Sequence, residues 1–163
     1  LRHAAVCKRW SLICAPRGAF ARLVETAGDA SSELRAAARG ELKRLSGEEA
    51  SGRQMDALVA LLRVGDEDEK ADVAETLREL AMDDDNKAAI AAAGGIEVLV
   101  SLVRDGNERQ KENAAGALWN LADNEDNKVA IAAAGGVEVL VALARDGNEA
   151  QKERAAGALW NLA

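Results

Sequence analysis

One stretch of this chain is repeated almost unchanged, and that repeat limits what the chain can fold into. Residues 86–122 and 127–163 match at 31 of 37 positions when the sequence is shifted by 41 residues. A weaker copy precedes them over residues 55–81, where Leu77 falls 41 positions before Leu118. A tandem repeat of this period is typical of a solenoid, in which no unit buries its apolar faces alone and neighbours must stack.

Short breaker motifs divide each unit into three segments. In the first clear unit the breakers are Gly94-Gly95 and Asp105-Gly106. A glycine pair lacks the Cβ atoms that disfavour a left-handed backbone, so the first short helix ends there and the chain turns sharply. The sequence therefore predicts three helices per unit. The three segments are residues 86–93, 96–104 and 107–122.

The apolar residues of the second and third segments recur at helical spacing and are expected to form the core between stacked units. They are Val98, Leu99, Leu102 and Val103, followed by Ala114, Leu118 and Leu121. Asn107 and Gln110 provide an N-cap and its reciprocal partner at the start of the third helix. The acidic runs 66–69 and 83–85 lack the alternating ligands and central glycine of a calcium loop, so we expect solvated, capping turns.

Composition supports a helical fold. Apolar residues make up 48% of the chain but aromatic residues only 2%, so the core must consist of Ala, Leu, Val and Ile. This mixture favours close-packed helices over sheets. No apolar run approaches the roughly 18 residues of a membrane span, and no signal-peptide pattern opens the chain. We therefore expect a cytoplasmic or nuclear protein that does not contact a membrane.

No arrangement of residues points to catalysis or to a cofactor. The single histidine, His3, has no cysteine or acidic cluster near it in the sequence, as a metal site or a catalytic triad would need. Cys7 and Cys14 are too few for a disulfide framework, so we expect reduced thiols. No glycine-rich phosphate loop is present. We predict a non-enzymatic protein without a metal or a cofactor.

Charge is distributed unevenly along the chain. Residues 1–22 contain five basic residues and no acidic one, whereas the rest of the chain contains 16 basic and 28 acidic residues. The acidic part is a poor partner for nucleic acid, because phosphates need a basic surface. It favours a basic or mixed-charge polypeptide as the partner.

The order of these elements resembles the armadillo repeat. A short helix, a Gly-Gly break, a Val/Leu helix, an Asp-Gly turn and a long helix ending in AAGALWNLA follow one another in residues 86–122 and again in 127–163. The ALWNLA endings are similar to those of the β-catenin and adenomatous polyposis coli branch. HEAT repeats are the nearest alternative, but they usually have two helices per unit and lack the Gly-Gly break. The resemblance implies an all-α fold, a right-handed α-solenoid with three helices per repeat of about 41 residues.

The resemblance also implies a concave groove lined by third helices, where a ladder of Asn side chains holds an extended peptide. Asn120 and Asn161 match the ladder position. An amide suits this task because it offers both a donor and an acceptor to the peptide main chain. The other candidates lie on or beside the same helical face, and position 113/154 is where specificity is expected to vary. These further candidates are Asn113, Arg154, Gly116, Gly157, Trp119 and Trp160.

Two departures from the family pattern bear on this groove. In importin-α-like repeats a Trp lies four residues before the ladder Asn, where this chain has Gly116 and Gly157. This argues against stacking of lysine side chains between tryptophans. The earlier unit has Glu79 at the Asn position, so the ladder is expected to begin at Asn120. For each of two candidates a structural role remains open beside contact with a ligand: Asn120 could cap or bridge adjacent helices, and Trp119 could pack against the next repeat.

Residues 1–16 fit the repeat pattern poorly and end at Pro16, the only proline. The run from Val6 to Trp10 resembles the closing helix of an F-box, the module that docks a protein onto a cullin-type ubiquitin ligase. A divergent helix that caps the solenoid is the alternative. We assign residues 17–163 to the armadillo domain. Its approximate units are residues 17–46, 47–81, 86–122 and 127–163.

Two functions follow from these patterns. The first is a scaffold that binds an extended or disordered segment of another protein along the groove. The second is a substrate adaptor of a cullin-type ubiquitin ligase, which would use the same groove and residues 1–16. The chain stops at Asn161-Leu162-Ala163 without a polar cap. An apolar stacking face at that point predicts either further repeats or end-to-end association of the isolated chain.

Overall fold

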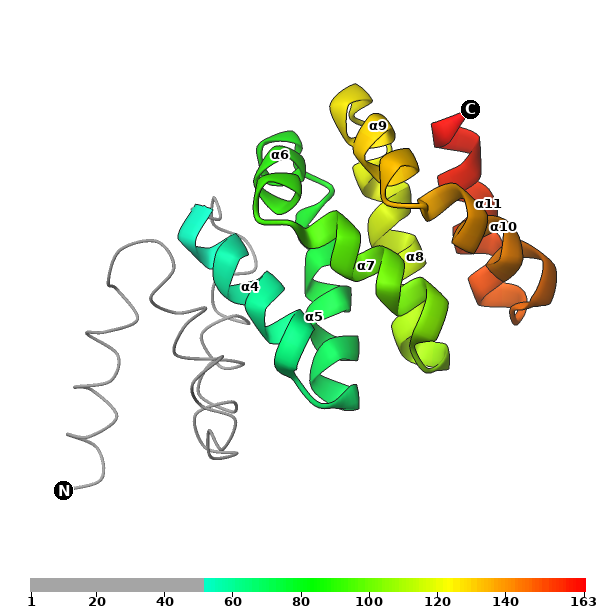
Figure 1. Ribbon diagram of the computed structural model, residues 1–163, viewed down its shortest axis with the longest axis horizontal. Coiled ribbons are helices and arrows are strands. Elements are labelled where there is room, and N and C mark those ends of the chain that lie inside the picture. Colours follow the sequence, from blue (N-terminus) through cyan, green and yellow to red (C-terminus); the bar gives the residue numbers. More distant parts are fainter. Residues whose placement is uncertain (1–51) are drawn as a thin grey trace, which may run out of the picture.

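The computed structural model describes the backbone of residues 52–163 and the side chains of residues 55–163. This part consists of eight helices and contains no strand, as expected for an all-α solenoid (Figure 1). The predicted unit 17–46, the segment 1–16 with its F-box resemblance, and both cysteines lie outside the described residues.

The helices follow the repeat found in the sequence. The unit that begins the described part contributes two helices, and the two near-identical units contribute three each, with bounds shifted by the same 41 residues. The predicted segments agree with the observed helices to within two residues at each end. The helices are α4 (Gly52–Val64), α5 (Glu67–Leu80), α6 (Asp84–Ala92), α7 (Gly95–Asp105), α8 (Glu108–Leu121), α9 (Glu125–Ala133), α10 (Gly136–Asp146) and α11 (Glu149–Leu162).

Glycine pairs make the sharp turns inside the repeats. Gly94 and Gly135 have φ angles of +75° and +77°, in the left-handed region that other residues disfavour. The helices on either side of each pair are bent by 81° relative to each other. The short first helix of each unit therefore crosses the second helix almost at right angles.

Side-chain caps start the helices as predicted. Asp66, Asn107 and Asn148 each form a capping box with the residue three positions later. In the first acidic run, the Asp66 side chain accepts a 2.9 Å hydrogen bond from the Glu69 N–H. In the second acidic run, Asp83 caps α6. Both runs thus have the capping role expected of them.

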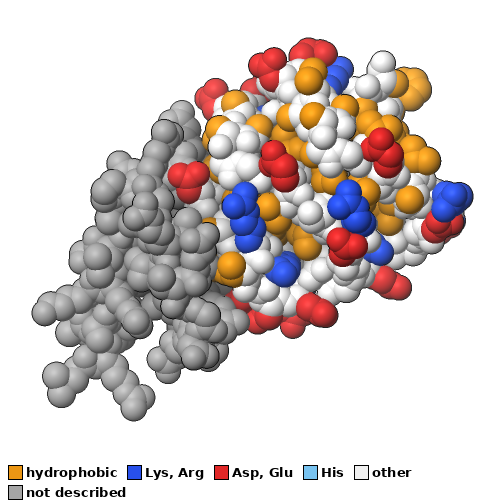
Figure 2. Space-filling view, viewed as in Figure 1, with side chains coloured by type: hydrophobic (Ala, Val, Ile, Leu, Met, Phe, Trp, Pro, Cys, Tyr) orange, Lys and Arg blue, Asp and Glu red, His pale blue; other side chains and the backbone are white. Residues whose placement is uncertain are grey.

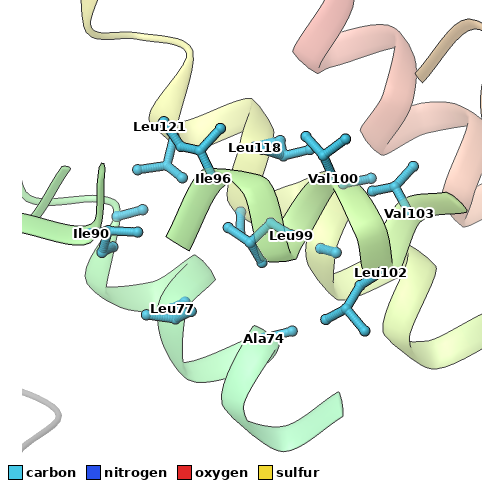
Figure 3. Packing of buried hydrophobic residues seen from close by; sticks show 14 of the residues in the cluster. Ala74, Leu77, Ile90, Ile96, Leu99, Val100, Leu102, Val103, Leu118 and Leu121 are labelled. Carbon is cyan, nitrogen blue, oxygen red and sulfur yellow. The ribbon is translucent and has the colours of Figure 1, made fainter. Parts of the chain in front are cut away.

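One apolar core runs through the described repeats. Figure 3 shows part of the cluster of buried apolar side chains, which includes Leu77 of α5, Ile90 of α6, Leu99 of α7 and Leu118 of α8. These four side chains are at most 1% exposed, although they come from two different units. The core is therefore made by stacking, because apolar faces of successive units cover one another.

Second and third helices form two rows in Figure 1. The third helices pack directly, α5 against α8 and α8 against α11, while α7 and α10 pack against their own third helices. Within the described residues no single helix is long and apolar enough to cross a membrane; the pairs α6–α7 and α9–α10 pass that test only when each bent pair is taken together.

The left-handed glycine of the last repeat gives a first prediction. An alanine Cβ at Gly135 would meet no atom closer than 3.7 Å, so only its φ of +77° opposes substitution. We expect Gly135→Ala to lower the free energy of unfolding by about 1–2 kcal/mol, and Gly135→Asn by less, because Asn tolerates this conformation. Urea unfolding followed by circular dichroism measures both. An alanine variant as stable as the parent would contradict the expectation.

Candidate functional site

The ladder asparagines contact the preceding repeat. The Asn120 Nδ2 donates a 2.8 Å hydrogen bond to the main-chain carbonyl of Arg78 in α5. The Asn161 Nδ2 donates to the carbonyl of Trp119 in α8 at 3.2 Å. Both carbonyls belong to the last turn of a helix, where main-chain oxygens have no partner within the helix. The two asparagines therefore cap the third helix of the repeat before them.

This hydrogen bond uses the amide nitrogen of each asparagine and leaves its oxygen as an acceptor. Asn120 and Asn161 are half-buried, and their Oδ1 atoms accept no hydrogen bond from the described residues. One amide hydrogen is used between repeats; for Asn161 the same nitrogen also lies 3.5 Å from Asp123 Oδ1. An acceptor of fixed orientation thus recurs at equivalent positions of α8 and α11. Asn120 thus bridges α8 and α5, which is the structural role that the sequence left open for it.

Asn113, expected at a position of varying specificity, contacts the preceding repeat. The side chain is buried, with 5% of its surface exposed, and its amide donates to the carbonyl of Ala71 at 3.0 Å. Its counterpart Arg154 is half-buried, and the buried Arg154 Nε has no hydrogen-bond partner. The same position therefore joins two helices in one repeat and leaves a charged donor unused in the next.

Glycines in the third helices make room for side chains of the previous repeat. A Cβ on Gly157 would lie 2.5 Å from Cδ2 and Cε2 of the Trp119 indole. A Cβ on Gly116 would lie 2.7 Å from Cδ of Arg78, which takes the place of Trp119 one unit earlier. Trp119 thus packs against the next repeat, the second alternative that the sequence left open. Trp160, which has no repeat after it in this chain, is 83% exposed.

Further polar contacts join the third helices at their amino-terminal ends. The Nε2 atoms of Gln110 and Gln151 donate to the carbonyls of Glu67 and Glu108, at 2.7 and 2.9 Å. Sequence reasoning identified Gln110 as a capping residue and missed this second bond. Recurrence of Gln at the same position in both units was the available signal.

Arg109 contributes an ion pair on the same helices that the sequence did not indicate. Its guanidinium lies 2.9 Å from Asp72 and 3.0 Å from Glu75, both in α5. The hydrogen bond to Glu75 contributes most to raising the pKa of Arg109 above its ordinary value. Position 109 becomes Ala150 in the next unit, so this link exists only between α5 and α8 among the described helices.

Three further observations concern the surface. An open depression of about 560 Å³ lies among α4, α5, α7 and α8 and contains none of the predicted site residues. Among residues 55–163 no group of three or more His, Cys, Asp or Glu side chains could hold a metal ion. Figure 2 shows charges of both signs interspersed on the face in view, with apolar side chains exposed over the last repeat.

Stacked three-helix units joined through their third helices define an α-solenoid repeat protein. A family model of the armadillo/β-catenin-like repeat matches residues 83–123 and 124–163. The chain belongs to the armadillo repeat family, and the alternative of HEAT repeats is set aside. It is an armadillo repeat scaffold, a fold that is typically non-enzymatic.

Solved structures show the same fold. One engineered protein is 33% identical with a TM-score of 0.73, over 89% of this chain and 38% of its own. Another is 30% identical with a TM-score of 0.70, over 93% and 69%. A designed armadillo repeat protein, solved in complex with the peptide (KR)4, is 21% identical with a TM-score of 0.71, over 87% and 63%. No curated protein matches the chain in sequence.

The two helix glycines give a matched prediction. Replacing Gly by Ala inside a helix ordinarily stabilises it by roughly 0.5–1 kcal/mol. At Gly157 the new methyl group would overlap the Trp119 ring, so we expect Gly157→Ala to destabilise the fold by about 1–3 kcal/mol. Gly116→Ala should change stability less, because the flexible Arg78 side chain can move aside. Urea unfolding of both variants compares them.

Removing the indole provides the control for this pair. In a Trp119→Ala background the Gly157→Ala change should no longer destabilise. If Gly157→Ala stabilises the parent chain, the indole does not restrict this position.

Proposed function

We propose that this chain binds an extended segment of another protein along α5, α8 and α11. The observation that carries the proposal is the recurrence of a half-buried amide, Asn120 and then Asn161, whose Oδ1 is left as an acceptor. An extended peptide has main-chain N–H groups to donate, and it loses few bonds of its own on binding. The amide is suited to any peptide sequence, because it contacts only the main chain.

The fold prepares these amides for binding. Their hydrogen bonds to Arg78 and Trp119 hold each side chain in one orientation, so less conformational freedom is lost when a ligand arrives. Each hydrogen bond from the peptide main chain to one of these amides contributes about 1 kcal/mol net to binding. Two such positions support weak binding, and higher affinity needs side-chain contacts as well.

Two further observations support a peptide partner. The designed armadillo repeat protein in complex with (KR)4 shows that a protein of this fold was solved with a peptide. The net charge of this chain is −7, which favours a basic or mixed-charge partner over an acidic one. The same charge disfavours nucleic acid as a ligand.

The asparagine proposal is tested by peptide selection. We expect the chain to enrich peptides from a random library displayed on phage, and the Asn120→Ala/Asn161→Ala variant to lose them, because the acceptors are gone. The readout is enrichment together with fluorescence-anisotropy titration of synthetic copies. Circular dichroism must show that the variant is folded, since each substitution also removes a bond between repeats worth about 1 kcal/mol.

Asn127 offers a matched control. Its buried amide donates to the carbonyls of Lys87 and Leu121 and so joins neighbouring units through α9, which carries none of the proposed contacts. Asn127→Ala should destabilise the solenoid similarly and keep peptide binding. If the chain binds no peptide, or if the double variant binds as well as the parent, the proposal fails.

We also propose that isolated copies of this chain associate through the surface of α10 and α11. Val137, Val141 and Trp160 are 37%, 53% and 83% exposed there. The counterparts of the two valines one unit earlier, Ile96 and Val100, are 2% exposed because the next repeat covers them, and Trp119, the counterpart of Trp160, is half-buried. The equivalent apolar surface of α10 and α11 is not covered by another repeat, and an exposed apolar surface favours association.

Sedimentation at increasing concentration tests this association. We expect the parent chain to form oligomers and a Val141→Lys/Trp160→Lys variant to remain monomeric, because both charges would have to be buried in the contact. Lys substitution at the exposed Met82, which lies outside this surface, is the control. A parent chain that stays monomeric at high concentration would contradict the proposal.

A further inference from the structure

Two arginine side chains approach the same glycine, Gly116 of α8. Arg78 reaches Gly116 from α5, and Arg154 reaches it from α11 on the other side of α8. A Cβ built on Gly116 would lie 2.7 Å from the Cδ of Arg78 and 3.5 Å from the Cδ of Arg154. The aliphatic stems of both side chains therefore approach the same point of α8, where the helix has no side chain.

Neither arginine has an acidic partner in the part of the chain that the structure describes. Among residues 55–163, no carboxylate lies within salt-bridge distance of Arg78 or Arg154. The nearby Glu75 is instead paired with Arg109 at 3.0 Å. The Nε of Arg154 is buried and has no hydrogen-bond partner. Buried donors are ordinarily satisfied, so an unused charged donor in this place needs an explanation.

We infer that Arg78 and Arg154 form a subsite for the carboxylate of an Asp or Glu side chain in the bound peptide. A guanidinium offers N–H donors in a planar fork that matches a carboxylate, and such charge-assisted bonds are short and strong. One carboxylate between two like charges also relieves their repulsion. The inference rests on the proposed function, because the subsite lies on the helices that carry Asn120 and Asn161.

The subsite occurs once in the described part of the chain. Arg78 stands where the next unit has Trp119, and Arg154 stands where the previous unit has Asn113. Only the junction at Gly116 therefore receives two arginines, while Gly157 receives the Trp119 indole. A single subsite selects an acidic residue at one position of the peptide. It thereby fixes how the peptide is aligned along the helices, whereas the amides alone would bind it in any alignment.

This narrows the class of partner. The acidic chain favours basic residues in the ligand, and the arginine pair selects one acidic residue among them. The partner is thus a mixed-charge extended segment with an Asp or Glu at the position that faces Gly116. A purely basic peptide would leave both arginines without a counter-charge.

The subsite is tested on peptides selected from a random phage-displayed library. We expect Asp or Glu to be enriched at one position of peptides selected on the parent chain. Replacing that residue by Gln or Asn should weaken binding roughly tenfold, as for the loss of a charge-assisted pair. In Arg78→Met/Arg154→Met, which keeps apolar stems over Gly116, the acidic peptide and its neutral copy should bind equally.

Arg104→Met/Arg145→Met is the matched control, since it removes two positive charges from α7 and α10 and should keep the preference for the acid. Arg154→Gln alone gives an independent second variant, in which the preference should fall. Peptides that bind without an enriched acid, or with a preference unchanged in Arg78→Met/Arg154→Met, would overturn the subsite and leave peptide binding intact. If the parent chain selects no peptide, both inferences fail together.

Discussion

Each repeat of this solenoid is completed by the next, and close packing of the third helices is the contact on which the other features depend. Leucine and alanine side chains of successive units cover one another, so the core passes from unit to unit without a break. Gly116 and Gly157 let a large side chain of the previous repeat lie directly on a helix backbone. In the same packing, Asn120 and Asn161 lie within hydrogen-bond distance of carbonyls of the preceding third helix.

Stability and the proposed recognition involve the same side chain. Asn120 uses an amide hydrogen to cap α5 and leaves its Oδ1 as an acceptor, which is the atom that the proposed peptide binding uses. The Asn113 side chain is buried, and its amide donates to the carbonyl of Ala71 in the preceding repeat. Arg154, at the equivalent position, makes no such hydrogen bond, and its buried Nε has no partner. One repeat position thus provides a contact between repeats in one unit and a proposed binding residue in the next.

Local signals predicted much of the architecture. The glycine pair at Gly94, the capping residues Asn107 and Gln110, and the apolar spacing of Leu99 and Leu118 each act through neighbouring residues, and each has the expected role. The roles of Asn113 and Trp119 could not be settled in the same way. Which side of a third helix faces the previous unit depends on how two helices pack, and a repeat period does not contain that information.

The sequence by itself determined the repeat, its three helices and the family, because these follow from spacing, caps and breakers along the chain. Only the tertiary structure decided which candidates are accessible and which residues meet across repeats. Arg78 and Arg154 are 76 positions apart in the sequence. Both approach Gly116 because α5 and α11 pack on either side of α8. The physical reason is that contacts between units depend on helix orientation, which no single unit specifies.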